Sequence, residues 1–161
     1  MQIEKVVVNA SPLILLFKSG LEDLLPQLFS TIIVPEAVWD EILRGGDIAA
    51  QKLLDNEATW ITRITIQIPP EILVWNLGDG ESEVLSWAFA NRNFRAVIDD
   101  KAARNCAKTI GIETLGTGGM LVLAKRRGLI DSVGEALDKL QAVGLYVSDE
   151  IIKLLQHQAG E

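Results

Sequence analysis

The stretch VVVNASPLI, residues 6–14, decides the first unit of the fold. Three β-branched residues run into Asn9, and a Ser-Pro pair then opens a second apolar run. β-branched side chains favour strands, whereas a serine N-cap followed by proline is typical of a helix start. The stretch therefore predicts a short buried strand over 5–8, followed by a helix that Ser11 caps and Gly20 ends. One amide side chain, that of Asn9, stands at the junction.

Strand-like and helix-like runs alternate along the rest of the chain. Short apolar runs predict strands at 31–34, 96–98, 112–115 and 145–147, and the alternating WITRITI predicts a half-exposed edge strand at 60–66. Helices are predicted over 35–46, 47–57, 81–92, 101–111, 118–128, 131–144 and 148–158, with a short amphipathic piece at 21–29. Uniformly apolar strands separated by helices are typical of parallel sheets covered on both faces. We therefore predict one α/β domain over residues 1–161, a three-layer α/β/α sandwich whose mostly parallel central sheet has 6–8 and 96–98 as inner strands.

The composition is that of an ordinary globular chain, with 48% hydrophobic and 23% charged residues. No apolar run reaches the length that a bilayer-spanning helix needs, so no membrane association is expected. The formal net charge of −7 argues against a protein that coats nucleic acid without sequence preference, because such binding depends on Lys and Arg. The single cysteine, Cys106, excludes an internal disulfide framework and fits a reducing cytoplasm, which is the expected location.

Polar side chains stand where a ligand site is expected. In doubly covered parallel sheets, ligands bind beyond the carboxyl ends of the strands. Asn9 and the pair Asp99-Asp100 directly follow two of the predicted strands, and Glu41 and Glu81 lie on helices next to strands. Two adjacent acids at a strand end, with no Lys or Arg before them, favour a cation. We expect these positions to converge on one cleft.

Glu81 is the most informative of these side chains. It shares the helical spacing of Val84, Leu85 and Ala88, and a carboxylate on such an apolar face is costly to bury unless something pairs with it. Glu83 is expected to face water. The alternative for Glu81 is a simple first-turn acid that the helix dipole favours. The sequence leaves these two interpretations about equal.

Each of the other positions also has a simpler interpretation. Asp100 suits the N-cap of the following helix, Glu41 suits a solvated helix face, and Asn9 suits a turn between strand and helix. Histidine-based triads and zinc sites are excluded because His157, the only histidine, has no partner. Cys106 is predicted to be a core residue rather than a nucleophile.

Several longer segments resemble those of PIN domains, in the same order. They are VVVNASPLILLFKSGLEDLL (6–25), IIVPEAVWDEIL (32–43), LGDGESEVLSWA (77–88), VIDDKAAR (97–104) and LGTGGMLVLAKRRGLI (115–130). They are most similar to a branch described as a domain of unknown function and grouped with the toxins of the VapBC toxin–antitoxin type. The resemblance covers nearly the whole chain, and the segment 116–130 is the most specific to that branch.

This resemblance implies a PIN-like fold and a hydrolase that cuts RNA phosphodiester bonds with Mg²⁺ or Mn²⁺. It places the catalytic positions at Asn9, Glu41, Glu81 and Asp100, and the metal ligands at Glu41, Glu81 and Asp100, with Asp99 as a possible substitute. It also implies supporting or RNA-binding roles for Ser11, Arg104 and Thr117. The expected partners are an RNA substrate, a small antitoxin protein and a second copy of the chain in a homodimer.

Asn9 is a departure from the family pattern, because the first carboxylate of a D-x-S motif is an amide in the NAS of residues 9–11. An amide oxygen can still bind a hard cation. The missing charge costs about 2 kcal/mol against a divalent ion at about 4 Å in water-like screening, which is more than a tenfold loss of affinity. The alternative function is therefore a catalytically weakened PIN domain that acts as a protein-binding module. A phosphotransfer domain ranks well below both, since no D-x-D follows the first strand.

Overall fold

The computed structural model describes residues 5–55 and 58–161, in which ten helices surround five strands. The strands are β1 (Lys5–Val8), β2 (Thr31–Pro35), β3 (Ile61–Ile64), β4 (Arg95–Val97) and β5 (Thr114–Leu115). The helices are α1 (Ala10–Ser19), α2 (Leu24–Leu28), α3 (Glu36–Gly45), α4 (Ile48–Leu54), α5 (Pro70–Leu73), α6 (Asp79–Ala90), α7 (Lys101–Thr109), α8 (Thr117–Arg126), α9 (Val133–Ala142) and α10 (Asp149–Gln158).

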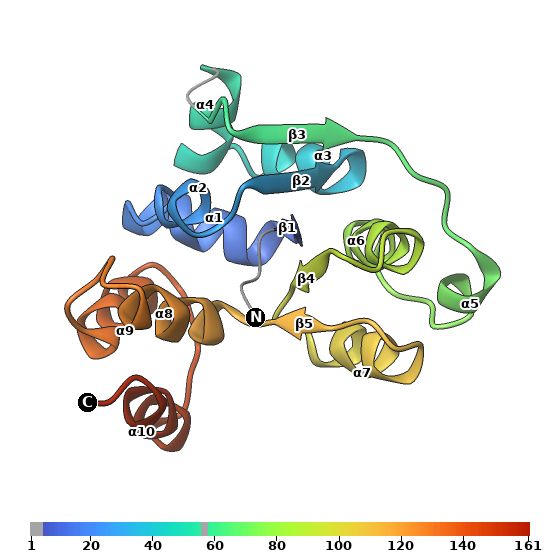
Figure 1. Cartoon of the computed structure of the whole chain (residues 1–161). Coiled ribbons are helices and arrows are strands. Elements are labelled where there is room, and N and C mark those ends of the chain that lie inside the picture. Colours follow the sequence, from blue (N-terminus) through green and yellow to red (C-terminus); the bar gives the residue numbers. More distant parts are fainter. Residues whose placement is uncertain (1–4, 56–57) are drawn as a thin grey trace.

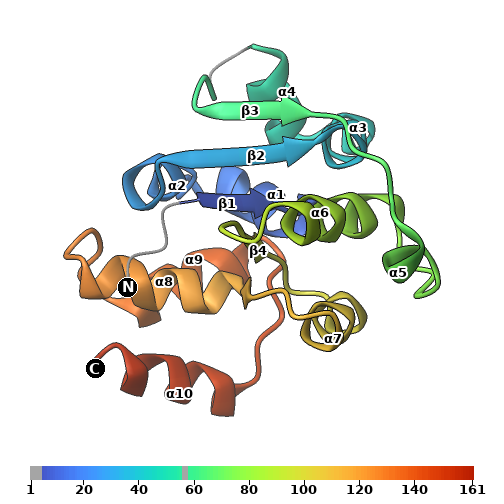
Figure 2. The same cartoon turned by 45° about the vertical axis from the view of Figure 1, so that its right-hand side comes forward.

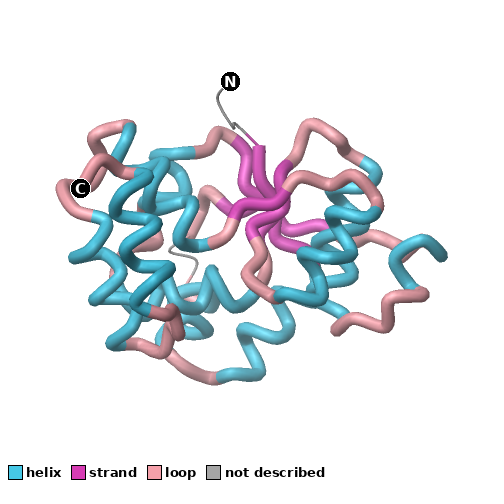
Figure 3. Tube along the Cα trace, turned by 90° about the horizontal axis from the view of Figure 1, so that it is seen from below, coloured by secondary structure: helices cyan, strands magenta, loops and turns pink. Residues whose placement is uncertain are grey.

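The five strands form one sheet in the order β3-β2-β1-β4-β5, and every neighbouring pair is parallel (Figure 1). The centre of the sheet is β1, where Val7 pairs with Ile33 of β2 and with Ala96 of β4. Helices α1, α8 and α9 lie on one side of the sheet and α6 and α7 on the other, which Figure 3 shows from below. The predicted three-layer α/β/α sandwich is confirmed, and so are the two inner strands.

Burial explains why β1 occupies the centre. Val6, Val7 and Val8 are fully buried, and so are Val97 and Ile98 at the end of β4. A strand that is apolar on both faces is stable only when helices cover both, as they do here. Among the described residues, no helix combines the length and the apolar character that crossing a membrane requires.

The structure corrects the predicted starts of two helices and the predicted end of a third. Helix α1 begins at Ala10 with Asn9 as its N-cap, so Ser11 lies inside the first turn, where the proline that follows it is tolerated because first-turn N–H groups have no partner within the helix. Helix α6 begins at Asp79 rather than 81, with Gly78 as N-cap. The helix predicted over 47–57 ends at Leu54, and residues 56–57 lie outside the described residues.

The strand predicted at 145–147 is wrong. The N–H of Leu145 donates to the carbonyl of Leu140 at 3.0 Å and that of Gly144 donates to Gln141 at 3.2 Å, so this backbone closes the end of α9. Gly144 has a φ of 120°, which turns the chain away from the helix. The run of three apolar letters is therefore a loop between α9 and α10.

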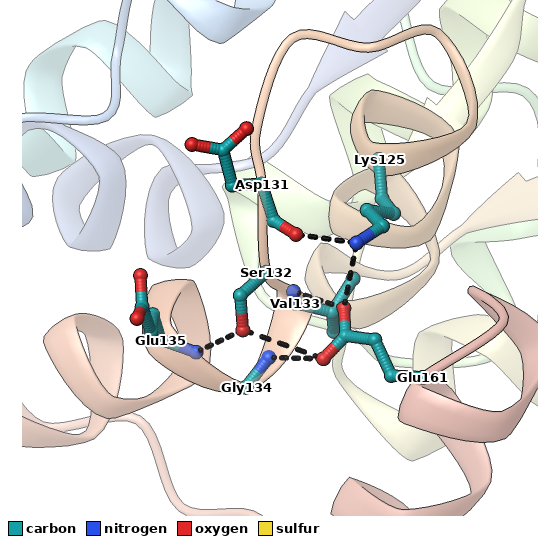
Figure 4. A network of polar contacts seen from close by, with 7 residues as sticks. All are labelled: Lys125, Asp131, Ser132, Val133, Gly134, Glu135 and Glu161. Carbon is teal, nitrogen blue, oxygen red and sulfur yellow. Dashed lines mark hydrogen bonds and ion pairs between the residues drawn. The ribbon is translucent and has the colours of Figure 1, made fainter.

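Helix α10 is the outermost element, packed on α8 and α9 (Figure 2). It has no buried residue of its own, and a polar network helps to hold it. After the helix, the Glu161 carboxylate accepts hydrogen bonds from the backbone N–H of Val133 at 2.5 Å and of Gly134 at 3.3 Å (Figure 4). It also accepts from the Ser132 hydroxyl and pairs with Lys125 at 3.8 Å. Glu161 thus caps the first turn of α9, and the Val133 N–H contributes most to lowering the pKa of this carboxyl.

We expect Glu161→Gln to lower the free energy of unfolding at neutral pH and to change it little in acid. A depressed carboxyl pKa stabilises the fold above the pKa of the unfolded chain, and that contribution is lost as the pH falls through the folded pKa. Glu161→Ala also removes the accepting oxygens and should cost about 1 kcal/mol, as the loss of a helix cap does. Denaturant unfolding from neutral pH into acid measures both effects.

The control for this prediction is Glu150→Gln, which neutralises an exposed acid in the first turn of α10. It should leave the pH dependence of unfolding as it is in the wild type. Equal stability of wild type and Glu161→Gln at neutral pH would contradict the assigned role of Glu161.

Candidate functional site

The site begins where β1 ends beside β4. The backbone N–H of Asn9 donates to the carbonyl of Val97 at 3.0 Å, which continues the β1–β4 pairing by one residue. Asn9 is 4% exposed, and its side-chain oxygen Oδ1 is buried without a hydrogen-bond donor among the residues that the structure describes. Buried polar atoms in native proteins nearly always have a partner. This oxygen is therefore available to a ligand.

Gly80 leaves a space between Asn9 and Glu41. A methyl group placed on Gly80 would lie 3.5 Å from Asn9 Oδ1, 3.5 Å from Glu41 Oε1 and 3.4 Å from Val38 Cγ2. The second residue of α6 thus lies against the end of β1 and against α3 at once. The missing side chain at Gly80 is what lets the amide oxygen and the carboxylate oxygen face the same small volume.

Glu41 and Glu81 are close enough for their charges to interact. The pKa of the Glu41 carboxyl is raised, mainly by desolvation and then by the negative charge of Glu81, while Arg44 opposes the shift. The residue Glu41 as a whole is exposed, so the desolvation acts on the carboxylate end that faces Gly80. Glu81 is half-buried, and its carboxylate folds back over Gly78, where a methyl group would lie 2.5 Å from Oε2. Asn9, Glu41 and Glu81 therefore form one group.

Asp99 and Asp100 form a second group at the end of β4, and each has a distinct partner. Asp100 accepts a hydrogen bond from the N–H of Ala103 at 2.9 Å, so it caps α7 as its simpler interpretation predicted. Asp99 accepts from Thr117 twice, from the N–H at 2.8 Å and from the hydroxyl at 2.6 Å. Thr117 is 1% exposed and opens α8, so this contact joins β4 to that helix.

Arg104 lies beside Asp99, and Ser11 lies apart. A methyl group on Gly116 would lie 2.8 Å from Arg104 Nη1 and 3.1 Å from Asp99 Oδ1, so the two charged groups meet over Gly116. Arg104 Nη1 also donates to the Ile98 carbonyl at 3.5 Å. Ser11 is exposed in the first turn of α1.

The prediction for Glu83 is wrong. The side chain is half-buried and accepts a hydrogen bond from the N–H of Ala37 at 3.1 Å, so an acid of α6 caps the start of α3. Its pKa is raised, mainly by desolvation, with further contributions from Asp79, Glu36 and Asp40. The sequence signal is Pro35, which as the N-cap of α3 supplies no side-chain hydrogen bond and leaves the first N–H groups to a distant acceptor.

The oxygen atoms of the first group fit a hard divalent cation. Mg²⁺ is bound by carboxylates and amide oxygens, usually few of them together with water. The unpartnered Asn9 oxygen and the space above Gly80 meet this requirement, and Glu41 and Glu81 supply charge. Within residues 5–55 and 58–161, no three His, Cys, Asp or Glu side chains are close enough together to hold a metal ion by themselves. The Asn9 amide oxygen is therefore a candidate ligand beside these two carboxylates.

Gly80→Ala should raise stability and abolish the response to a divalent cation. Alanine in a helix is favoured over glycine by about 0.5–1 kcal/mol, and the new methyl group makes only ordinary contacts here. The same methyl group fills the space between Asn9 and Glu41. We expect Mg²⁺ or Mn²⁺ to raise the melting temperature of the wild type and to leave that of this variant unchanged.

The matched control is Gly45→Ala at the end of α3, where a methyl group would meet nothing within 4 Å. It should keep the cation response of the wild type. An unchanged cation-induced shift in Gly80→Ala would exclude the space above Gly80 as the binding position.

Residues 5–161 match the model of the family DUF3368, which is described as a PIN domain. The match includes all elements that carry the two groups of site residues, from the start of β1 to the end of α10. No curated protein and no solved structure matches the chain significantly. The resemblance to PIN domains that the sequence motifs indicated is confirmed.

Proposed function

The chain belongs to this PIN-domain family, and from that premise we propose that it is a metal-dependent endoribonuclease that hydrolyses RNA phosphodiester bonds. A PIN domain is a nuclease-type fold, so the coarser assignment is a hydrolase that acts on nucleic acid. The finer assignment is supported by one observation above all. The buried Asn9 oxygen has no hydrogen-bond donor and shares the space above Gly80 with the Glu41 carboxylate.

In this proposal, Glu41, Glu81 and Asn9 hold Mg²⁺ or Mn²⁺, and Asp100 or Asp99, which belong to the second group, act on the ion through its water ligands. Such an ion, when bound, lowers the pKa of a water ligand and neutralises charge that develops on the phosphoryl oxygens. The amide of Asn9 positions oxygen ligands but cannot accept a proton. Proton acceptance from the attacking water therefore falls to a carboxylate, and Glu41 suits it because its Oε1 borders the space above Gly80.

The groups around Asp99 have a different task in the proposal. Asp99 holds the Thr117 hydroxyl and lies beside Arg104, whose guanidinium can bind a phosphate through paired hydrogen bonds. Attack of water on phosphorus breaks the bond to the 3′ oxygen, and that oxygen leaves as a 3′-hydroxyl after taking up a proton. A phosphate next to the cut would face Arg104, while the reacting phosphate faces Glu41 and Glu81.

A second candidate function is a PIN module with weak or no catalysis that acts by binding another protein. Asn9 itself favours it, because the first acidic position carries no charge and the remaining acids fall into two groups. The toxin role, the small antitoxin partner and the homodimer rest on the resemblance of the sequence motifs to the toxin branch. The toxin role belongs to the nuclease candidate, and the two protein partners are proposed under either candidate.

The wild type should cleave single-stranded or structured RNA only when Mg²⁺ or Mn²⁺ is present. Glu41→Gln, Glu81→Gln and Asp100→Ala should each lower the cleavage rate at least about tenfold, because each removes a full charge near the ion. Gel analysis of end-labelled RNA measures the rates. Glu71→Gln, an exposed acid on α5, is the control and should cleave like the wild type. Cleavage that is independent of divalent metal would overturn the proposal.

Asn9→Asp should tighten cation binding more than tenfold and lower stability without a cation. The new charge attracts a divalent ion by about 2 kcal/mol at about 4 Å and repels Glu41 and Glu81 when the ion is absent. Calorimetric titration with Mn²⁺ and thermal unfolding with and without Mn²⁺ measure the two effects. A nuclease should also gain rate, whereas a binding module gains only the affinity. Unchanged Mn²⁺ affinity would show that the Asn9 position does not bind the ion.

A further inference from the structure

A cavity of about 650 Å³ lies between the start of α8 and α10. It borders the second group of acids, Asp99 and Asp100, here called the Asp99 group. Asp99, Arg104, Gly116, Tyr146 and Leu155 are among its lining residues. A second cavity of about 440 Å³ continues along the edge of β5, where Arg104 and Lys108 line it. Arg104 and Thr114 belong to both cavities, so the two form one path over the edge of the sheet.

Tyr146 stands at one end of this path with an almost fully exposed ring. It is 94% exposed, the largest value among the exposed large hydrophobic residues of the described chain. The backbone on both sides of it is held, since Leu145 N–H donates to Leu140 and the Val147 carbonyl accepts from Gln141 at 3.5 Å. The loop therefore presents an aromatic ring from a fixed backbone.

The charges along the path are favourable for a polyanion. Of the residues that line the larger cavity, Asp99 and Arg104 are the charged ones, and the Asp99 carboxylate already accepts two hydrogen bonds from Thr117. In the smaller cavity, Arg104 and Lys108 face one acid, Glu113, which is paired with Arg95 at 2.6 Å. The path thus carries two cations on a protein whose net charge is −7.

We propose that this path binds single-stranded RNA next to the cleavage site, with a base stacked on Tyr146 and backbone phosphates at Arg104 and Lys108. The inference rests on the proposed function and adds where the substrate lies beyond the reacting phosphate. Proteins that bind single strands combine cations along the backbone with aromatic rings for the bases. The exposed Tyr146 ring has this combination together with Arg104 and Lys108.

A peptide is the other ligand that the larger cavity would accommodate, since Ile151 and Leu154 also line it and are 45% and 49% exposed. RNA is favoured because the path carries two cations beside Asp99 and Asp100, whereas the exposed aliphatic residues of the larger cavity, Ile151 and Leu154, both lie on α10. A polynucleotide held at the site must continue on both sides of it, and the path offers the Tyr146 ring on one side of Arg104 and Lys108 on the other.

The test measures RNA binding separately from cleavage. Fluorescence anisotropy with labelled single-stranded RNA in Mg²⁺ is recorded in a Glu81→Gln background, in which cleavage is slowed, and gel analysis of each sample verifies that the RNA is intact. Tyr146→Ala should weaken binding about five- to hundredfold, whereas Tyr146→Phe keeps the ring and should bind like the parent. Tyr146→Leu keeps the apolar volume without the ring and should bind like Tyr146→Ala. Leu73→Ala, at a 63% exposed position on α5, is the control.

Salt dependence tests the phosphate contacts. Arg104→Gln and Lys108→Gln should each lower the slope of log affinity against log salt by about 0.7, the value for one phosphate contact with a single strand. The slope for Tyr146→Phe should not change.

The outcomes separate the inference from the proposed function. If the wild type cleaves RNA and Tyr146→Ala binds RNA like its parent, the path is wrong and the nuclease proposal stands. If Tyr146→Leu binds RNA as tightly as its parent, the proposed stacking of a base on Tyr146 is wrong. If Tyr146→Ala loses self-association in sedimentation and keeps RNA affinity, this face binds protein and the inference fails. RNA that neither binds nor is cleaved would overturn both.

Discussion

The rest of the structure depends on the pairing of β1 with strands on both sides. Because Val6, Val7 and Val8 are fully buried, polar side chains can appear only where the strand ends. The first such residue is Asn9, whose N–H bonds to Val97 of β4 and so fixes the end of one strand beside the end of the other. The parallel direction of all five strands brings the start of α3 and the residues after β4 to the same edge. This pairing therefore sets where Asn9 lies relative to Asp99 and Asp100, and α6 completes the site by packing against β1 and α3.

The acids at that edge are destabilised in their charged form by desolvation and by one another. Glu41 has a raised pKa because it is desolvated and lies near Glu81, so the group is under repulsion when no cation is present. An aspartate in place of Asn9 would add a third charge within the same space. The amide therefore reduces the electrostatic cost of the cation-free fold and also weakens the attraction for a cation. Compared with an aspartate, Asn9 thus lowers the affinity for a cation and stabilises the cation-free fold, while its Oδ1 stays at the same place.

The sequence predicted the fold well because the informative runs are uniform. β-branched runs with no polar alternation can only be inner strands of a doubly covered sheet, and both such runs are inner strands here. Residues 145–147 show the same apolar composition but serve to close α9, a role that depends on the carbonyl of Leu140 and not on the run itself. The prediction that Glu83 faces water is wrong for a similar reason, because the N–H group that it caps, that of Ala37, belongs to another helix. A local sequence pattern does not reveal a hydrogen-bond partner that lies on another element.

The candidate site was predictable in part for the same physical reason. Strand ends gave Asn9 and the pair Asp99-Asp100, because parallel topology forces strand ends together. The sequence does not tell the roles of the two adjacent aspartates apart. Their roles depend on hydrogen bonds that they accept on different sides, Asp100 from Ala103 and Asp99 from Thr117. The space above Gly80 was not predictable, since it results from α6 lying against β1 and α3 at once.

Helix α10 follows a different principle from the rest of the fold. The inner layers are held by apolar burial, whereas α10 buries no residue fully and depends on close contact and charge. A methyl group on Gly118 would lie 2.6 Å from Leu155 Cδ1, so the glycine of α8 provides the notch into which α10 fits, and the Glu161 carboxylate holds the far end. The wall that carries Tyr146 beside the Asp99 group is therefore attached by contacts weaker than those of the core. Because the pKa of Glu161 is lowered whereas that of Glu41 is raised, a fall in pH protonates Glu41 before Glu161, so the attachment of α10 and the group of acids at Asn9 respond to acid separately.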